Sequence, residues 1–105
     1  MLDAADLATA EARWRAVLAA EPGSAEGLYG LGWTLHLAGK PDLAREAFQR
    51  LVDAHPDVHL GYKGLGSVAM AEGNGALARR RFEEALARAP GDPAVRHSLG
   101  LLALG

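Results

Sequence analysis

Hydrophobic and polar residues alternate along this chain with the spacing of amphipathic helices. Leu28, Leu31 and Leu35 are three and four residues apart, so they share one face of a helix. Beside that apolar face runs a second line of residues at the same spacing, made by Glu26, Tyr29, Trp33 and His36. The segment therefore predicts a helix with one buried face and one neighbouring face free for contacts.

Capping signals divide the chain into six predicted helices. The expected N-cap residues are Ser24, Asp57, Asn74 and Asp92, the last followed by proline at the first helical position. Gly39 and Gly73 suit the left-handed residue that follows a helix. The predicted helices cover residues 3–20, 25–38, 41–54, 58–72, 75–88 and 93–104, and the short loops between them make neighbours antiparallel.

The sequence repeats itself with a period of 34 residues. At that shift the segment GLYGLGWTLHLAG at 27–39 aligns with GYKGLGSVAMAEG at 61–73. Further along, Ala44, Phe48 and Pro56 align with Ala78, Phe82 and Pro90, and backwards Ala10, Trp14 and Pro22 join the same register. We therefore expect one domain over 1–105, with full units at 25–58 and 59–92 and half units at 1–24 and 93–105.

Both full units resemble the tetratricopeptide repeat. The first fills the family pattern with Leu28, Leu31, Gly32, Leu35, Ala44, Phe48 and Pro56, and the second with Tyr62, Leu65, Gly66, Ala69, Ala78, Phe82, Ala85 and Pro90. Two positions depart from it, because Leu28 replaces the usual tryptophan and Leu51 the usual alanine. The resemblance implies an all-α fold, a right-handed α-solenoid of antiparallel helix pairs with about six helices.

Glycines inside the predicted helices need a physical reason. The six in the two aligned segments cost roughly 5 kcal/mol together, at about 0.8–1 kcal/mol each relative to alanine. We expect close helix approach to offset that cost, with Phe48 and Phe82 packing over the gaps. A phosphate-binding loop is the alternative, but the order GxxGxG differs from the dinucleotide fingerprint and no Gly-Lys-Ser/Thr follows.

Composition and charge exclude several classes of function. A formal net charge of −2 disfavours nucleic acid as the main partner, and the absence of cysteine excludes disulfides and thiolate metal sites. The N-terminus carries acids where a secretion signal would be basic, and no apolar run is long enough for a membrane span. We expect a cytoplasmic protein with no membrane partner.

No arrangement of residues suggests catalysis, a cofactor or a metal. His55 and His59 have helical spacing, but Pro56 interrupts a helix between them. Ser98 next to His97 cannot face it on a helix. The run of arginines near residue 80 is expected to form the pairs Arg79–Glu83 and Arg80–Glu84 on one exposed face. The prediction is a protein that is not an enzyme and that has no catalytic residue, cofactor or metal ligand.

In the family that this chain resembles, the first helix of each pair lines a concave groove. The residues predicted for it are Glu26, Tyr29, Trp33, His36, Leu60, Lys63, Ser67, Met70, His97 and Leu101. Their aromatic and apolar character suits a peptide or partner protein, with Lys63 and His97 as polar anchors. The alternative is that Trp33 only packs against the next unit. The basic set that clamps acidic chaperone tails is missing, so no such ligand is expected.

The last predicted helix is apolar around most of its circumference. Leu99, Leu101, Leu102 and Leu104 all need cover, whereas terminal repeats are ordinarily polar outside. Either the natural chain continues, or two copies bury these ends as a homo-oligomer. The leading hypothesis is a non-catalytic protein-interaction module, and the alternative is a helical accessory or oligomerisation segment of a larger enzyme or transport assembly.

Overall fold

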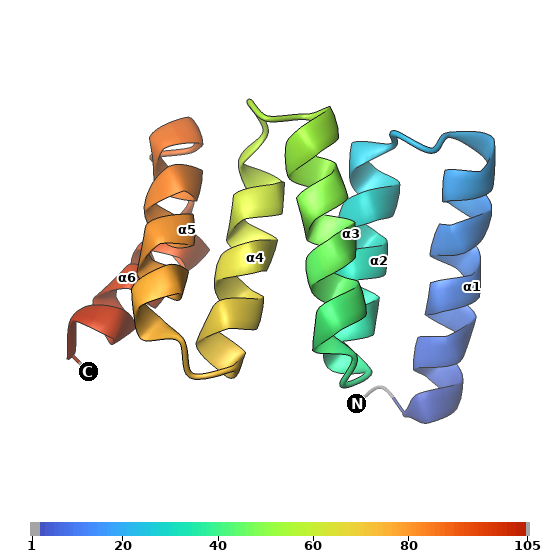
Figure 1. The fold of residues 1–105 in the computed structure, drawn as a ribbon, viewed down its shortest axis with the longest axis horizontal. Coiled ribbons are helices and arrows are strands. Elements are labelled where there is room, and N and C mark those ends of the chain that lie inside the picture. The colour runs from blue at the N-terminus through green and yellow to red at the C-terminus, as the bar shows by residue number, and fades with distance from the viewer. Residues whose placement is uncertain (1–2, 105) are drawn as a thin grey trace.

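The computed structural model describes residues 3–104, and in that range it contains six α-helices and no strand. They are α1 (Ala4–Ala20), α2 (Ala25–Leu37), α3 (Pro41–Ala54), α4 (His59–Ala71), α5 (Gly75–Arg88) and α6 (Pro93–Leu104). In Figure 1 they form a row across the view from α1 to α6, in which α2 lies partly behind α3 and α6 partly behind α5. The predicted all-α fold is confirmed, and every predicted boundary lies within one residue of the observed one.

Three of the four predicted N-caps form. Ser24 accepts a hydrogen bond from the backbone N–H of Gly27, and Asn74 accepts one from Leu77. Asp92 accepts from Ala94 at 2.9 Å. The prediction for Asp57 is wrong, because the N-cap of α4 is Val58 and makes no side-chain cap bond. Asp57 lies inside a turn closed by the Val58 N–H and the His55 carbonyl, so the helix begins too late for its carboxylate to cap it.

The ends of α2 and α4 share one backbone motif. Gly39 and Gly73 have φ of 76° and 79°, the left-handed region that favours glycine. After α2 the Lys40 N–H donates to the Leu35 carbonyl at 2.9 Å, and Gly39 donates to His36 at 3.1 Å. These two hydrogen bonds form the Schellman motif, which satisfies carbonyls left free at a helix end. The predicted glycine stops are confirmed, and each turns the chain back on itself.

The helices fall into two types that alternate along the chain. We call α2, α4 and α6 the A helices and α1, α3 and α5 the B helices, following the repeat register. Each helix packs on the next one in the chain, and α2 also contacts α4. In Figure 1, α1 and α6 occupy the two opposite ends of the row. No helix in residues 3–104 has the length and apolarity to cross a membrane.

Four of the six glycines inside α2 and α4 are sockets for aromatic rings, and the predicted packing of Phe48 and Phe82 over them is confirmed. A Cβ atom added to Gly32 would lie 2.5 Å from Cε1 of Phe48, and one added to Gly66 would lie 2.8 Å from Cδ1 of Phe82. Phe48 also fills the space at Gly64 on the following A helix, so its ring is held between α2 and α4. Both phenylalanines are at most 1% exposed. Any atom added at these positions would collide with a phenylalanine ring and disrupt the packing of the core, which explains why the positions are glycine.

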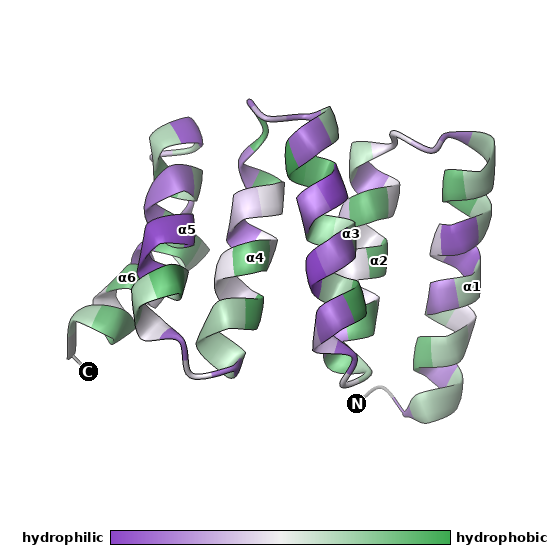
Figure 2. Ribbon diagram, in the orientation of Figure 1, coloured by the Kyte–Doolittle hydropathy of each residue, from purple (hydrophilic) through white to green (hydrophobic). Residues whose placement is uncertain are grey.

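Two hydrophobic clusters form the core, one around each phenylalanine. The first joins Phe48 to Leu28, Leu31 and Leu35 of α2, and the second joins Phe82 to Tyr62 and Val95. Figure 2 shows how polarity differs between the helices. On the side toward the viewer, α3 and α5 carry strongly hydrophilic turns, whereas α4 and α6 are pale to green, that is, neutral to hydrophobic. The B helices thus expose charge outward and send Phe48 and Phe82 inward.

Candidate peptide-binding surface

The predicted contact residues lie on all three A helices. We call this surface the A-helix face, and it consists of Glu26, Tyr29, Trp33, His36, Leu60, Lys63, Ser67, Met70, His97 and Leu101. Because α2 packs directly on α4, the first eight of these residues belong to adjacent helices. Glu26 is exposed and the other seven on α2 and α4 are partly buried. These eight residues therefore lie on two packed helices, and seven of them are neither buried nor fully exposed.

An aromatic cluster forms the α2 half of the A-helix face. The Tyr29 and Trp33 rings meet edge to face, with centroids 6.1 Å apart, and both lie 6.0 Å from the ring of Phe48. His36 adds a further edge contact to Trp33 at 5.4 Å. Such contacts hold rings in fixed orientations and add about 0.5–1.5 kcal/mol per pair to their burial. The buried Phe48 ring therefore contacts both Tyr29 and Trp33, whose rings remain partly exposed.

The α4 half of the A-helix face is dominated by an ionic network. Lys63 Nζ donates to Oδ2 of Asp92 at 3.0 Å, and His59 Nε2 lies 3.1 Å from the same oxygen. The Lys63 ammonium, supported by the N–H groups of Ala94 and Val95, lowers the pKa of Asp92 to about 2 against the opposing effect of burial. The positive charge of Lys63 is therefore already compensated by a carboxylate of its own chain.

Sequence reasoning identified Asp92 only as a helix cap and missed this network. The signal that was available is positional: Asp92 begins α6, one unit beyond the loop that begins α4, and loops of successive units lie near each other in a stacked repeat. The cap already fixes the carboxylate, so a long basic side chain on α4 reaches it easily. Asp92 consequently links the last two A helices as well as capping one.

The other residues of the α4 half are Leu60, Ser67 and Met70, and none of them carries an aromatic ring. The Ser67 hydroxyl donates to the Lys63 carbonyl at 3.0 Å, which holds it against its own helix. Leu60 packs against the cluster around Phe48, and Met70 packs against the cluster around Phe82. The aromatic rings on α2 are therefore the only large aromatic groups of the A-helix face within the described residues.

The α6 part of the A-helix face behaves differently. His97 is exposed, and Leu101 is 49% exposed. Leu101 lines a hollow of about 540 Å³ whose other walls are Gly75, Ala76, Arg79 and Leu102, so it faces the start of α5. The side chain of Leu104, predicted to need cover, lies outside the described residues. The structure joins the predicted residues of α2 and α4 and sets those of α6 apart.

A family model for the tetratricopeptide repeat matches residues 2–59 and 63–105. The chain belongs to the tetratricopeptide repeat family. Proteins of this family generally mediate protein–protein interactions and are typically non-catalytic. The search of curated proteins gave no match.

Solved tetratricopeptide structures resemble this chain over nearly its whole length. A crystal structure of MamA matches with 25% identity and a TM-score of 0.79, over 97% of this chain and 64% of that one. A second MamA structure matches with 26% identity and a TM-score of 0.76, over 93% and 54%. The first tetratricopeptide domain of Spaghetti (RPAP3), bound to an HSP90 peptide, has 14% identity and a TM-score of 0.86, over 95% and 79%. The chain thus spans less than two thirds of the MamA chains.

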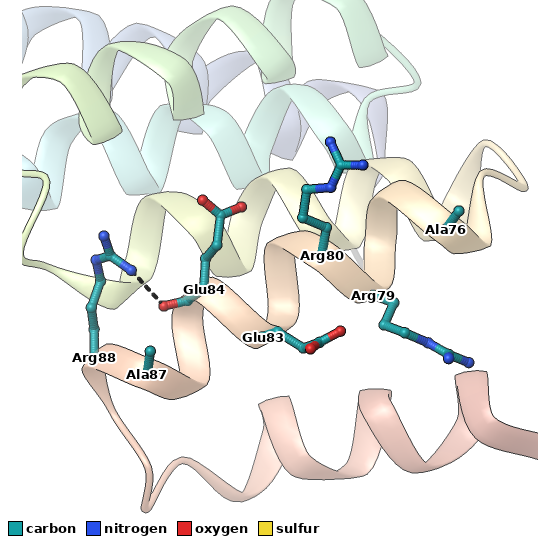
Figure 3. Close-up of a pocket in the computed structure, with 7 residues that line it drawn as sticks. All are labelled: Ala76, Arg79, Arg80, Glu83, Glu84, Ala87 and Arg88. Carbon is teal, nitrogen blue, oxygen red and sulfur yellow. Dashed lines mark hydrogen bonds between the residues drawn. The ribbon is translucent and has the colours of Figure 1, made fainter.

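A second hollow of this tetratricopeptide domain lies along α5, away from the A-helix face. Figure 3 shows its lining residues on one side of that helix, with Glu83 and Arg79 on the side toward α6. The predicted pairs Arg79–Glu83 and Arg80–Glu84 are wrong, because Glu84 instead pairs with Arg81 at 3.0 Å. Arg79 donates to the Leu102 carbonyl at 3.3 Å, one of the free acceptors at a helix C-terminus. Arg79 therefore links α5 to α6, whereas the Arg81–Glu84 pair lies within α5.

The paired histidines contact different loops of the repeat. His55 Nε2 lies 2.6 Å from the Gly23 carbonyl, and His59 contacts Asp92. Each imidazole therefore joins one turn to the turn of a neighbouring unit. Among residues 3–104 no three histidine, aspartate or glutamate side chains gather as metal ligands would.

Proposed function

We propose that this tetratricopeptide domain binds a peptide, or a segment of a partner protein, across the α2 and α4 part of its A-helix face. No catalytic role, cofactor or nucleic acid is part of the proposal. The ligand class is an apolar peptide with at least one large hydrophobic side chain. Tyr29 and Trp33 are the expected anchors, and Glu26 and His36 lie at the polar margin of the contact.

The aromatic cluster is the observation that carries the proposal. Tyr29 and Trp33 are fixed edge to face over the buried Phe48, yet both remain partly open to solvent. Aromatic rings held in place lose little conformational entropy on binding, and such residues dominate the energy of protein interfaces. If Trp33 served only to pack the repeat, full burial like that of Phe48 would be the expected outcome.

The electrostatics of the A-helix face argue for an apolar rather than an acidic ligand. The tetratricopeptide domain of Spaghetti (RPAP3) is bound to the HSP90 peptide SRMEEVD, which is rich in carboxylates. On this chain Lys63 is the lysine of the face, and Asp92 already neutralises it at 3.0 Å. An acidic C-terminal peptide would have to displace that carboxylate, so we expect no tight binding of SRMEEVD.

Fluorescence of Trp33 provides a direct test. A Trp14→Phe background removes the other tryptophan and places at 14 the residue found at the equivalent positions 48 and 82. Peptides selected from a random library on the Trp14→Phe domain are titrated while Trp33 emission is followed. We expect an emission shift with peptides rich in hydrophobic residues, and none with SRMEEVD.

Two variants distinguish the A-helix face from other surfaces. Trp33→Ala should weaken the selected peptides by about 1–2 kcal/mol, roughly 5- to 30-fold, measured by calorimetry. Leu37→Ala is the matched control, because Leu37 is on the same helix, is 57% exposed and lies off the face. Equal affinity for wild type and a folded Trp33→Ala variant would contradict the proposal, as would a Leu37→Ala loss of the same size.

A further inference from the structure

Gly100 occupies the same repeat position as Gly32 and Gly66, but its socket is empty. In α2 and α4 the glycine at this position receives the phenylalanine of the B helix that follows. A Cβ atom added to Gly100 would meet no atom of the described part of the chain within 4 Å, and Gly100 is exposed. Its neighbour Leu99 is only partly buried, whereas Leu31 and Leu65 are 3% and 6% exposed. Among the described residues no B helix covers this side of α6.

The opposite end of the row has the reverse arrangement. Trp14 of α1 aligns with Phe48 and Phe82, and Ala10 aligns with Ala44 and Ala78. The four inner residues are at most 1% exposed, but Trp14 and Ala10 are only partly buried. Trp14 fills the space at Gly30 on the following A helix. On its other side α1 has no A helix among the described residues.

These two ends are complementary halves of one helix pair. We propose that α6 of one copy packs on α1 of a second copy, with Trp14 of the second copy seated on Gly100 of the first. The contact continues an interface that the molecule already builds twice, in α2 with α3 and in α4 with α5. Within one copy the two ends cannot meet, because α1 and α6 lie at opposite ends of the row (Figure 1).

Charge along the junction agrees with this pairing. Where the two full units meet, Gln49 of α3 and Arg81 of α5 line one hollow over Leu65 and Ala69 of α4. By the repeat register, the residues that would line the corresponding hollow at the junction are Glu83 of one copy and Arg13 of the other. Glu83 and Arg13 therefore carry opposite charges at the two positions that Gln49 and Arg81 hold in the inner hollow, which favours the head-to-tail contact.

The proposed contact is heterologous, since it joins different surfaces of the two copies. A copy added by such a contact leaves one free α1 end and one free α6 end. Repeated addition therefore produces an open-ended chain, or a ring if the last copy meets the first, rather than a closed dimer. The proposal is independent of the peptide-binding function, because Gly100 and Trp14 lie off the A-helix face.

One variant at each end separates this proposal from other modes of association. Gly100→Leu places a side chain in the empty socket, and its Cβ would meet no described atom of its own copy within 4 Å. Ala10→Arg places a long side chain where the equivalent alanines are fully buried. Ala16→Arg is the matched control, because Ala16 is exposed and its equivalent in α3 is Arg50. Circular dichroism of each variant establishes that it is folded.

Sedimentation equilibrium of the 105-residue chain provides the readout. We expect the mean mass of wild type and of Ala16→Arg to rise with concentration beyond that of a dimer, and Gly100→Leu and Ala10→Arg each to remain monomeric. A mixture of the two blocked variants should form a one-to-one dimer, because each supplies the end that the other lacks. Monomeric wild type at every concentration would overturn the proposal. A dimer that survives in either blocked variant alone would also overturn it.

Discussion

The inner helix pairs and the end helices of this domain carry the same sequence pattern but differ in burial. Phe48 is fully buried between two glycine-bearing A helices, whereas Trp14, at the equivalent position of α1, has an A helix on one side only. Gly66 faces a phenylalanine, and its equivalent Gly100 faces no side chain of the residues that the structure describes. The repeat pattern therefore specifies an interface, and the stability that each residue contributes depends on whether both partners of that interface are present.

The largest expected effect is at Phe48. Phe48→Ala should destabilise the domain by about 3–5 kcal/mol, because the ring fills space against both Gly32 and Gly64 and leaves a cavity. Trp14→Ala, in the comparable position with one side open, should cost less. Urea unfolding followed by circular dichroism measures both. Equal losses at the two positions would show that the inner and end interfaces contribute alike and would contradict the comparison.

Adding a methyl group to a filled socket comes next. Gly32→Ala should destabilise by about 1–3 kcal/mol, because the new Cβ would lie 2.5 Å from a ring that Gly64 also confines. This loss has to exceed the gain of about 1 kcal/mol that alanine brings to a helix interior. A Gly32→Ala domain as stable as wild type in urea would mean that the Phe48 ring can shift freely.

The repeat predicted the fold almost completely, because the residues that pack against each other are close in the sequence and occur in both full units. Gly32 and Phe48 are 16 residues apart in the sequence, Gly66 and Phe82 likewise, and both pairs meet in the structure as expected. The stop at Gly39 could also be predicted, since a left-handed residue is required wherever the chain reverses after a helix. Redundancy of this kind leaves few alternative ways to bury the same apolar residues.

Polar contacts could not be predicted to the same extent. The pattern placed Lys63 on the A-helix face but gave no sign that Asp92, 29 residues away, would hold it. It also paired Arg79 with Glu83 by helical spacing, although Arg79 reaches a carbonyl of α6. Long charged side chains have many partners of similar energy within reach, so their choice depends on the final positions of neighbouring helices. The partner of the A-helix face is equally absent from a pattern that encodes packing.

A third prediction uses the ionic link that holds the end helix α6. The folded-state pKa of Asp92 is about 2, below its ordinary value of 3.8, so ionised Asp92 favours the folded state. This contribution, about 1–2 kcal/mol for a group that is slightly exposed, is present above about pH 4 and is lost as the pH falls toward 2. Asp92→Asn keeps a capping oxygen and should remove that part of the pH dependence.

Unfolding of both proteins by urea at several pH values tests the prediction. Wild type and Asp92→Asn should differ most at neutral pH and converge near pH 2. Asp57→Asn is the matched control, since Asp57 caps no helix and is exposed. A constant difference between wild type and Asp92→Asn from pH 7 to pH 2 would show that the carboxylate stabilises α6 by means other than its charge.

The smallest effect is expected at Gly100 and has the opposite sign. Gly100→Ala should raise the free energy of unfolding by about 0.5–1 kcal/mol at low protein concentration, because alanine favours the helix and its Cβ meets no described atom within 4 Å. Gly66→Ala, the same change one unit earlier, should destabilise. If the two substitutions change the free energy of unfolding in urea with opposite signs, then the cost of replacing glycine by alanine depends on whether its socket is filled, and not on the glycine itself. If both variants lost stability, Gly100 would have to contact another part of the chain, and α6 could not be a free end.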